Sequence, residues 1–424
     1  MTVHPHPIDI TFLIFDMIQV NPAERLGKVK EYYFSRKLAE IAHLRESGHD
    51  IVSLAIGSPD LPPPPIAIET LCTVAHDERS HGYQPTKGTP ELRQAIARFY
   101  KRHYGVLLDA DTEVLPLIGS KEGILHTTLA FVNPGDTVLV PDPGYPTYTS
   151  LPTLLGANVV HFPLKADADY QPDFDFLENL DTSHVRMLWT NYPNMPTGAK
   201  AQRETYERLV AFARQRGILV VNDNPYSFIL SKGDKLSIMQ VEGAKDCCIE
   251  FNSMSKSHNM PGWRVGMLVS NPDFVSWTLR VKSNIDSGTF RGLQLAAAAA
   301  IDIDDDWHRR YNVEVYSQRR ILAEMVMEVL SVEADFNKQV GMFLWARIPD
   351  SHPILPMLGD DNRERTLSER FVEYVLNHAG VFITPGFIFG HGGDRCVRLS
   401  LCASEERLAE ALKRIREMMQ NLVR

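Results

Sequence analysis

The sequence predicts an α/β fold: a large unit with a mostly parallel central sheet, joined to a small α+β unit built from both chain ends. Three observations support this. Short apolar, β-branched runs alternate with helical patterns through the middle of the chain. These runs are continuously apolar, which is typical of parallel strands covered on both faces. The 424 residues are 44% hydrophobic and 23% charged, as in globular proteins of two or three domains.

The expected strands of the large unit are Thr137–Val140, Val185–Trp189, Ile218–Val221, Cys248–Phe251 and Val265–Val269. A helix is expected between the second and third of them, at Thr205–Gln215. Its Leu209, Val210 and Phe212 are spaced for one buried face, and Gly217 provides the stop signal. A second helix, Ile124–Val132, follows a glycine-rich turn.

The two ends of the chain have a different pattern. A charged helix is expected over Ala23–Ser47, closed by Gly48. Beyond the large unit we expect a long helix at Tyr311–Leu330, a strand within Gly341–Ile348 and an amphipathic helix from Ser404. The prolines of Leu61–Pro65 predict a stiff connector. We therefore divide the chain into an N-terminal arm with part of the small unit (1–60), the large unit (61–310) and the rest of the small unit (311–424).

Composition excludes several classes of function. Lys and Arg number 44 against 53 Asp and Glu, a net charge of −9, whereas nucleic-acid binders are basic. Five cysteines without C-x-x-C spacing favour a reduced compartment and give no metal site, so we expect no metal. The apolar stretch Ile8–Val20 contains Asp9 and Asp16 and is too short to span a membrane. It also lacks the marks of a signal peptide, and we expect a cytoplasmic protein without a membrane partner.

The first chemical motif is Lys256, within Ser253-Met254-Ser255-Lys256 and eight residues before Arg264. S-x-x-K also occurs in penicillin-binding enzymes, but no S-D-N or K-T-G follows, so we discard that interpretation. A lysine just past a buried strand and among hydroxyls can form a Schiff base with a carbonyl cofactor. Considered alone, this motif is also compatible with an ordinary surface lysine.

Four further features lie at or after predicted strands, where open α/β sheets bind ligands. Asp223 follows Ile218–Val221 and can pair with a protonated cofactor ring nitrogen, or simply end the strand in a turn. Gly119–Gly123 opens a helix and provides either an anion site or a plain N-cap. The proline-rich Asn191–Gly198 is by itself a surface turn. Arg398 lies in an apolar strand and requires a carboxylate or phosphate, from a ligand or from a structural salt bridge.

With these motifs in this order, the sequence resembles the class I/II aminotransferases of the aspartate aminotransferase superfamily. These are fold-type I enzymes that use pyridoxal 5′-phosphate. The resemblance runs from Gly57-Ser58-Pro59-Asp60 through Tyr83–Gly88 to Arg398. It implies an aminotransferase that moves the amino group of an L-amino acid to a 2-oxo acid by a ping-pong mechanism, through a Lys256 aldimine.

The resemblance also implies a role for each motif residue. Lys256 would carry the cofactor and move the substrate proton, Asp223 would pair with the pyridinium nitrogen, and Arg398 would hold the substrate α-carboxylate with help from Gly57. Tyr226 would donate to the ring 3-oxygen. The remaining cofactor contacts would be Tyr145 on the ring face and a phosphate cup of Ser120, Lys121 (mainly through its backbone N–H), Ser253, Ser255 and Arg264.

The same resemblance implies a homodimer with shared sites. Tyr83 would reach the phosphate of the neighbouring subunit, and the segment Lys282–Gly288 would approach the same cup from across the dimer. One position departs from the family pattern, which has an asparagine directly before Pro-Thr-Gly. Met195 stands there, preceded by Asn194. We predict that Asn194 bonds the ring 3-oxygen; the alternative is that Tyr226 does so with less help.

The reaction and the substrate are less constrained. A carbon–sulfur β-lyase or a decarboxylase on the same scaffold is the alternative activity. The family fold also occurs in transcription regulators, but a basic winged helix-turn-helix would have to precede it, and the first family-like helix is expected already near Ala23. Relatives that prefer dicarboxylates carry a second arginine where Leu279 stands here, with Arg280, Lys282 and Arg291 close by in sequence. We therefore expect neutral or apolar amino donors to be preferred over aspartate, with 2-oxoglutarate or another 2-oxo acid as acceptor.

Overall fold

In the computed structural model, the described residues are 20–231, 233, 235–359 and 365–422. The helices over these residues include α1 (Tyr33–Glu46), α2 (Pro65–Ala75), α3 (Pro90–Tyr104), α4 (Ser120–Phe131), α5 (Thr147–Leu154), α6 (Phe174–Asn179), α7 (Arg203–Arg216), α8 (Ala244–Cys247), α9 (Met254–Ser257), α10 (Pro272–Lys282), α11 (Arg291–Ile301), α12 (Asp305–His308), α13 (Val315–Val329), α14 (Leu367–Ala379) and α15 (Glu405–Leu422). The strands are β1 (Val52–Ser53), β2 (Val114–Leu117), β3 (Thr137–Asp142), β4 (Asn158–Pro163), β5 (Val185–Thr190), β6 (Leu219–Asp223), β7 (Cys248–Ser253), β8 (Gly266–Val269), β9 (Phe343–Arg347), β10 (Val381–Phe382), β11 (Thr384–Pro385) and β12 (Cys396–Ser400).

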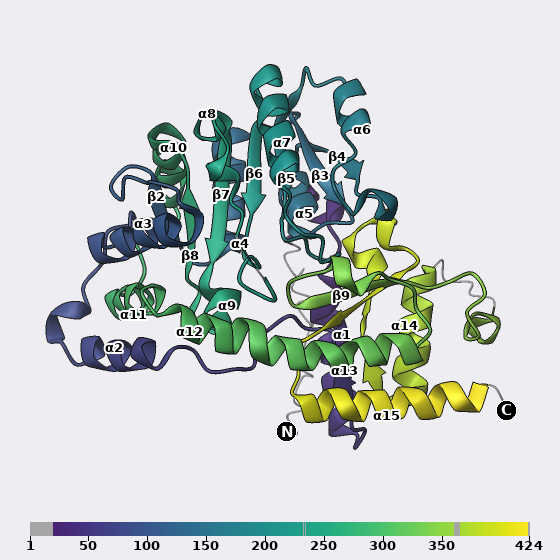
Figure 1. Ribbon diagram of the computed structural model, residues 1–424. Coiled ribbons are helices and arrows are strands. Elements are labelled where there is room, and N and C mark those ends of the chain that lie inside the picture. Colours follow the sequence, from purple (N-terminus) through teal and green to yellow (C-terminus); the bar gives the residue numbers. More distant parts are fainter. Residues whose placement is uncertain (1–19, 232, 234, 360–364, 423–424) are drawn as a thin grey trace, which may run out of the picture.

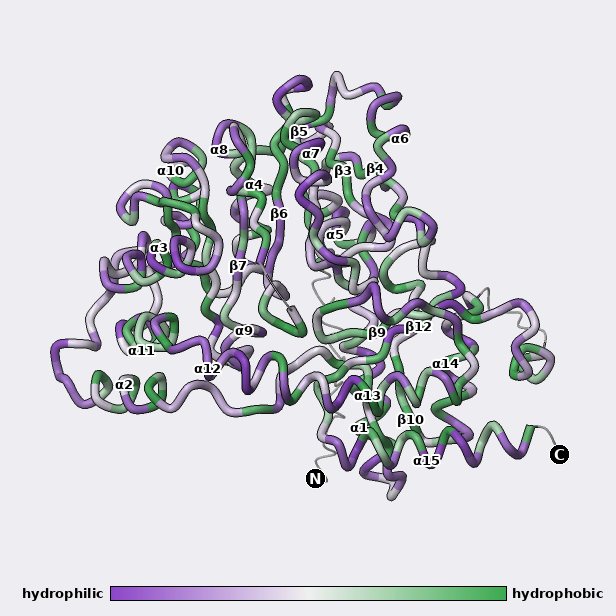
Figure 2. Tube along the Cα trace, in the orientation of Figure 1, coloured by the Kyte–Doolittle hydropathy of each residue, from purple (hydrophilic) through white to green (hydrophobic). Residues whose placement is uncertain are grey.

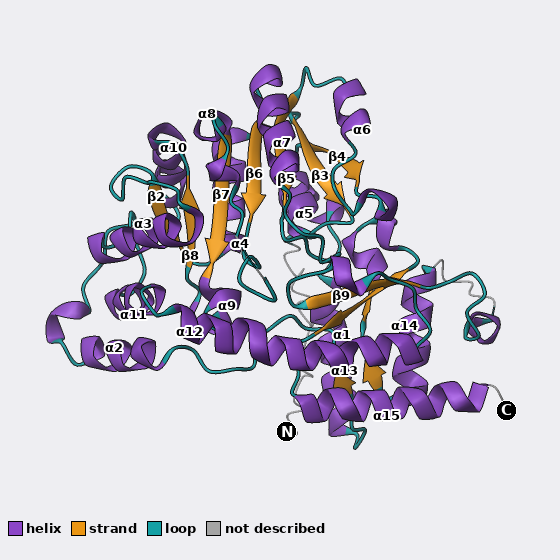
Figure 3. Ribbon diagram, viewed as in Figure 1, coloured by secondary structure: helices purple, strands orange, loops and turns teal. Residues whose placement is uncertain are grey.

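The centre of the large unit is a seven-stranded sheet in the order β2-β8-β7-β6-β5-β3-β4 (Figure 1). In this sheet β8 runs antiparallel to both of its neighbours, β2 and β7, and all other neighbouring strands pair in parallel, so the predicted mostly parallel sheet is confirmed. The five expected strands are β3, β5, β6, β7 and β8, each within a few residues of its predicted bounds. Helices lie on both faces of the sheet (Figure 3).

Alternate strand residues enter two separate hydrophobic cores. Val220 of β6 packs with α3, α7 and α11 on one face, whereas Val221 packs with α4 and α5 on the other. In Figure 2 the strands of the sheet show green, apolar stretches, interrupted by hydrophilic residues in β6 and β7. Helix α7 confirms the expected helix: its apolar residues are buried, and Gly217 ends it with a left-handed φ of +67°. Burial on both faces explains the continuously apolar strand sequences.

The small unit draws on both ends of the chain. Strand β1 pairs in parallel with β10, and β9, β12 and β11 form a three-stranded antiparallel sheet. One core joins residues of α1 and β1 to α13, α14 and α15. The division at residues 60 and 310 stays a prediction, and residues 1–19 lie outside the described chain. Within the part that is described, no helix is long and apolar enough to cross a membrane.

Two helix predictions need correction. The expected helix Ala23–Ser47 is broken: Glu24–Lys28 forms a separate 3₁₀ turn, and α1 begins only at Tyr33. The turn buries none of its residues and contains Gly27, so nothing in its sequence favours continuing the helix. The long helix near Tyr311 opens with a π-helical turn at Arg309–Glu314 before α13. The proline connector is extended to Pro64, and Pro65 opens α2, as proline at a first helical position favours.

Candidate active site

A cavity of about 410 Å³ opens at the carboxyl ends of β6 and β7, where the large and small units meet. It brings together most of the residues that the sequence analysis singled out. Its lining includes Gly57, Ser120, Lys121, Tyr145, Asp223, Tyr226, Ser253, Ser255, Lys256, Arg264 and Arg398. Parallel strands end at one edge of a sheet, which explains why motifs far apart in sequence meet here.

Lys256 lies on α9, the short helix that directly follows β7. Its Nζ donates a hydrogen bond to the carbonyl of Gly57, and no carboxylate among the described residues pairs with it. Burial lowers the pKa of this amine, with smaller contributions from Arg398 and Arg264. A Cβ at Gly57 would lie 2.2 Å from the Phe343 ring, so this close approach requires glycine. The arrangement favours an unprotonated, nucleophilic lysine.

Asp223 ends β6 and is buried at the floor of the cavity. The Tyr148 hydroxyl donates to its Oδ2 at 2.8 Å, while its Oδ1 is buried and has no partner among the described residues. Burial raises the pKa of this carboxyl group to about 6. A buried carboxylate oxygen without a donor is suited to a ligand that brings its own N–H.

The N-terminus of α4 provides an anion site at the other end of the cavity. Gly119, with a φ of +74°, precedes Ser120, and a Cβ on it would lie 2.2 Å from Arg264 Nη2. Ser253 and Ser255 add hydroxyls that are 3.0 Å apart. The Arg264 guanidinium donates to the carbonyl of Pro261 at 3.1 Å, and none of the described ion pairs includes it. Free backbone N–H groups, hydroxyls and a guanidinium together match a phosphate.

Arg398 projects from β12 into the opposite side of the cavity. It is 4% exposed and donates to the carbonyl of Ala55 at 2.7 Å. Its carbon Cζ lies 4.0 Å from the ring centroid of Phe343 and 4.7 Å from that of Phe389. Burial lowers its pKa to about 10, and the described residues supply no carboxylate partner. A buried guanidinium in an aromatic cage and without an acid is arranged to bind a ligand carboxylate.

Two tyrosines stand between these groups. Tyr226 is buried, and burial raises its pKa. Tyr145 packs edge-on against Tyr148, with ring centroids 5.4 Å apart. Both line the cavity, as the sequence analysis expected of residues that contact a ring.

The loop Asn191–Gly198 corrects one prediction. Met195, not Asn194, lines the cavity, and its Sδ lies 3.3 Å from Arg398 Nη1. The Asn194 amide is used inside the loop: its Oδ1 accepts from the Thr197 hydroxyl at 2.7 Å and its Nδ2 donates to the carbonyl of Asn191. A side chain already committed to its own turn cannot also reach the cavity.

Tyr83 is not part of the cavity in this chain; its side chain is 93% exposed. Sequence reasoning missed the aromatic wall formed by Tyr32, Phe34, Phe343 and Phe389, together with Tyr148 beneath Asp223. Spacing gave no signal for these residues, because they come from four separate elements and approach one another only in the folded chain. Leu279, in α10, packs against the core of the large unit.

Comparisons with known proteins agree with this geometry. A family model described as aminotransferase class I and II matches residues 49–415. An LL-diaminopimelate aminotransferase from Dehalococcoides mccartyi is 38% identical over 93% of this chain and 97% of the relative. One from Aquifex aeolicus is 36% identical over 93% of this chain and 98% of the relative.

Solved structures give the same picture. Substrate-bound BacF from Bacillus subtilis has a TM-score of 0.85 and is 33% identical, covering 94% of this chain and 98% of that one. A mutant of aspartate aminotransferase from Thermus thermophilus has a TM-score of 0.83 at 26% identity, covering 94% and 100%.

Proposed function

Because the chain belongs to the class I and II aminotransferases, which depend on pyridoxal 5′-phosphate, we propose that the Lys256 cavity is its active site and that the enzyme prefers neutral amino donors. The transfer of an amino group from an L-amino acid to a 2-oxo acid follows from the family. The assignment of the site rests on one observation: an amine, a carboxylate and a guanidinium, each without a counter-charge among the described residues, line one cavity.

The residues present fit the cofactor. The unpartnered Oδ1 of Asp223 suits a protonated pyridine nitrogen, and the turn at Gly119 with Arg264 suits a phosphate. The Lys256 amine suits the aldehyde carbon. When bound, the cofactor supplies an electron-poor ring that stabilises negative charge at the substrate Cα.

Each residue would then have a defined role in the reaction. Asp223, as a carboxylate, would hold the proton on the ring nitrogen. Lys256 would hold the cofactor through its Nζ, and the same amine, when free, would serve as the base for the substrate Cα proton. Arg398 binds the substrate carboxylate and so orients the Cα–H bond. The phenyl rings of Phe343 and Phe389 exclude water around that ion pair, which strengthens it.

The preference for neutral donors is supported by the wall around Arg398. Tyr32, Phe34, Ile56 and the two phenylalanines present apolar surface to a substrate side chain. A carboxylate on that side chain would lose its hydration there without gaining a partner.

LL-diaminopimelate is the second candidate donor, because the relatives carry that name and because one cation in the lining is uncommitted. The Lys121 ammonium lies 5.1 Å from the Tyr32 ring centroid, and both residues line the cavity. It could neutralise a distal carboxylate.

The two candidates are separated by kcat/KM for methionine, phenylalanine, aspartate and LL-diaminopimelate with one common acceptor. Neutral donors should exceed aspartate by about tenfold or more, a difference of roughly 1.4 kcal/mol. A dominant rate with LL-diaminopimelate that falls in Lys121→Met would establish the second candidate instead. Dominance of aspartate would refute both, and ammonia release without a 2-oxo acid would indicate the lyase.

The active unit is proposed to be a cytoplasmic homodimer. The exposure of Tyr83 supports this, because a tyrosine that is 93% exposed in its own chain is available to a second one. Five cysteines without a disulfide suit a reducing compartment. Mixing Lys256→Ala chains with Tyr83→Ala chains should restore activity, because one site of each hybrid then has both residues intact. If subunit exchange is demonstrated and no activity returns, Tyr83 does not act across the dimer.

A further inference from the structure

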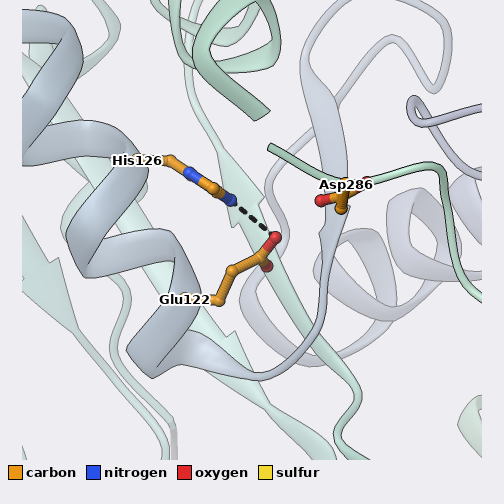
Figure 4. Close-up of side chains that lie close together, drawn as sticks. All are labelled: Glu122, His126 and Asp286. Atoms are coloured by element: carbon orange, nitrogen blue, oxygen red, sulfur yellow. Dashed lines mark hydrogen bonds and ion pairs between the residues drawn. The ribbon is translucent and has the colours of Figure 1, made fainter. Parts of the chain in front are cut away.

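A largely buried group of ionisable side chains lies beside the first turns of α4. It consists of Glu122, His126, Lys282 and Asp286, here called the charge cluster. Lys282 Nζ lies 2.9 Å from Glu122 Oε1 and also bonds Asp286, while His126 Nε2 lies 2.6 Å from the same Glu122 oxygen. Figure 4 shows Glu122 and His126 on one helix, facing Asp286 on a separate segment.

Lys282 supplies the cation of this cluster. The ligand atoms of Glu122, His126 and Asp286 lie within 4.8 Å of one another, a spacing that would also suit a metal ion. The Lys282 ammonium already bonds both carboxylates, and the side chain is only 2% exposed. A lysine so deeply buried is stable only when carboxylates neutralise it, so each member of the cluster depends on the others.

On one side the cluster holds the turn that enters α4. Glu122 Oε2 accepts from the backbone N–H of Ile118 at 2.7 Å, directly before Gly119 and Ser120. Although burial alone would raise it, hydrogen bonds from His126 and Lys282 lower the pKa of Glu122 to about 2, so the group stays ionised. Lys282 therefore holds the Glu122 carboxylate in place, and that carboxylate in turn holds the backbone at Ile118.

On its other side the cluster holds the segment after α10. Asp286 Oδ1 accepts from the Gly288 N–H at 2.9 Å. Gly288 has a φ of +82°, and a Cβ there would lie 2.4 Å from the carbonyl oxygen of Gln84, the neighbour of Tyr83. One ammonium thus joins the turn at Ser120 to the two segments expected at the dimer contact.

We propose that Lys282 is a positioning residue for the cofactor phosphate: through Glu122 it holds the Ile118–Ser120 turn in the geometry that binds the anion. This inference rests on the proposed function, which assigns that turn to the phosphate. Lysine suits the position because its compact ammonium reaches two carboxylates at once, whereas a planar guanidinium would need more room.

The test compares two forms of the cofactor that differ only in the phosphate. Dissociation constants for pyridoxal 5′-phosphate and for pyridoxal are measured by absorbance titration of the full-length chain freed of cofactor. Lys282→Met keeps the length of the side chain, and Glu122→Gln keeps its shape. Both should weaken pyridoxal 5′-phosphate at least about tenfold and change pyridoxal less than about twofold. Lys245→Met, which removes a lysine paired with Glu113 elsewhere in the large unit, should change neither constant.

Equal weakening of both forms in Lys282→Met and Glu122→Gln would show a merely structural role and overturn the proposal, as would unchanged affinity for both. Thermal unfolding of each variant checks that it folds. If Lys282→Met does not fold, the two dissociation constants of Glu122→Gln decide whether the cluster positions the phosphate site. Arg264→Gln separates this inference from the proposed function. If Arg264→Gln lowers the ratio of affinities for pyridoxal 5′-phosphate over pyridoxal and the Lys282 and Glu122 variants do not, the proposed role of Lys282 is wrong and the phosphate assignment stands. If Arg264→Gln leaves that ratio intact, the phosphate assignment itself is wrong.

Discussion

Arg398, Asp223 and Lys256 are held apart from counter-charges by the residues around them. Carbonyl oxygens, a tyrosine hydroxyl and phenyl rings surround them, so each is oriented but not neutralised. Uncompensated charge inside a protein lowers its stability, and it is retained where a ligand completes the pairing. All three groups were singled out in the sequence, because each is an unusual residue type at the end of a strand or inside one. They line one cavity in the folded chain, and their roles there stay predictions.

The orientation of the Asn194 side chain could not be predicted from the sequence, because it depends on which neighbours the amide reaches in the folded loop. Removing that amide should act on the loop and not on the cofactor. Asn194→Ala leaves the Thr197 hydroxyl and N–H without their acceptor, a cost of about 1–3 kcal/mol in the free energy of unfolding. The apparent pKa obtained from the pH titration of the bound cofactor's absorbance should be unchanged in this variant.

Met195→Ala is the matched comparison, because Met195 contacts Arg398. It should alter KM for the amino donor while leaving the hydrogen bonds of Asn194 within the loop intact. A shifted cofactor titration in Asn194→Ala, with none in Met195→Ala, would restore the original prediction for Asn194.

At the scale of elements, the strands of the sheet were predictable and the N-terminal helix was not. Continuous apolar runs indicate buried parallel strands directly, whereas the charged segment before α1 has no apolar periodicity that would mark where the helix begins. Tyr32 and Phe34, at the start of α1, reach the cavity, so the misplaced helix start accounts for part of the missed aromatic wall.

The turn before α4 gives a prediction at the same scale. Gly119→Ala places a Cβ 2.2 Å from Arg264 Nη2 at a positive φ, so the guanidinium must move. The affinity for pyridoxal 5′-phosphate should fall about tenfold or more, equivalent to roughly 1.4 kcal/mol. Gly217→Ala is the control: its φ of +67° imposes similar backbone strain, but nothing lies within 4 Å. It should lower stability by about 1 kcal/mol and leave the affinity unchanged. Equal affinities in the two variants would argue against a phosphate at this turn.

At the scale of the whole molecule, the cavity exists only where the two units meet. Gly57 and Arg398 come from opposite ends of the sequence, and Lys256 comes from the middle. Sequence order alone could place the motifs on a sheet edge but could not show that β12 and the segment after β1 close over it.

Buried histidines beside this junction make the stability of the fold sensitive to acid. Burial lowers the pKa of His258 to about 3 and also lowers that of His308. An unfolded histidine titrates near 6.5, so between these values the unfolded chain binds more protons and stability falls as the pH falls. At pH 5 His258 alone should lower the free energy of unfolding by about 2 kcal/mol relative to pH 7.

His258→Gln should flatten the dependence of Tm on pH, whereas His43→Gln on the surface of α1 should not. An unchanged profile in His258→Gln would show that this side chain does not set the acid limit.

All of the proposed chemistry depends on Lys256 as the residue that carries the cofactor. Borohydride reduction of the enzyme loaded with pyridoxal 5′-phosphate, followed by digestion and mass spectrometry, locates the attachment directly. We expect one modified peptide, with the reduced cofactor on Lys256 Nζ, and no modification in Lys256→Ala. Stoichiometric labelling of Lys121, or of any other lysine, would contradict it.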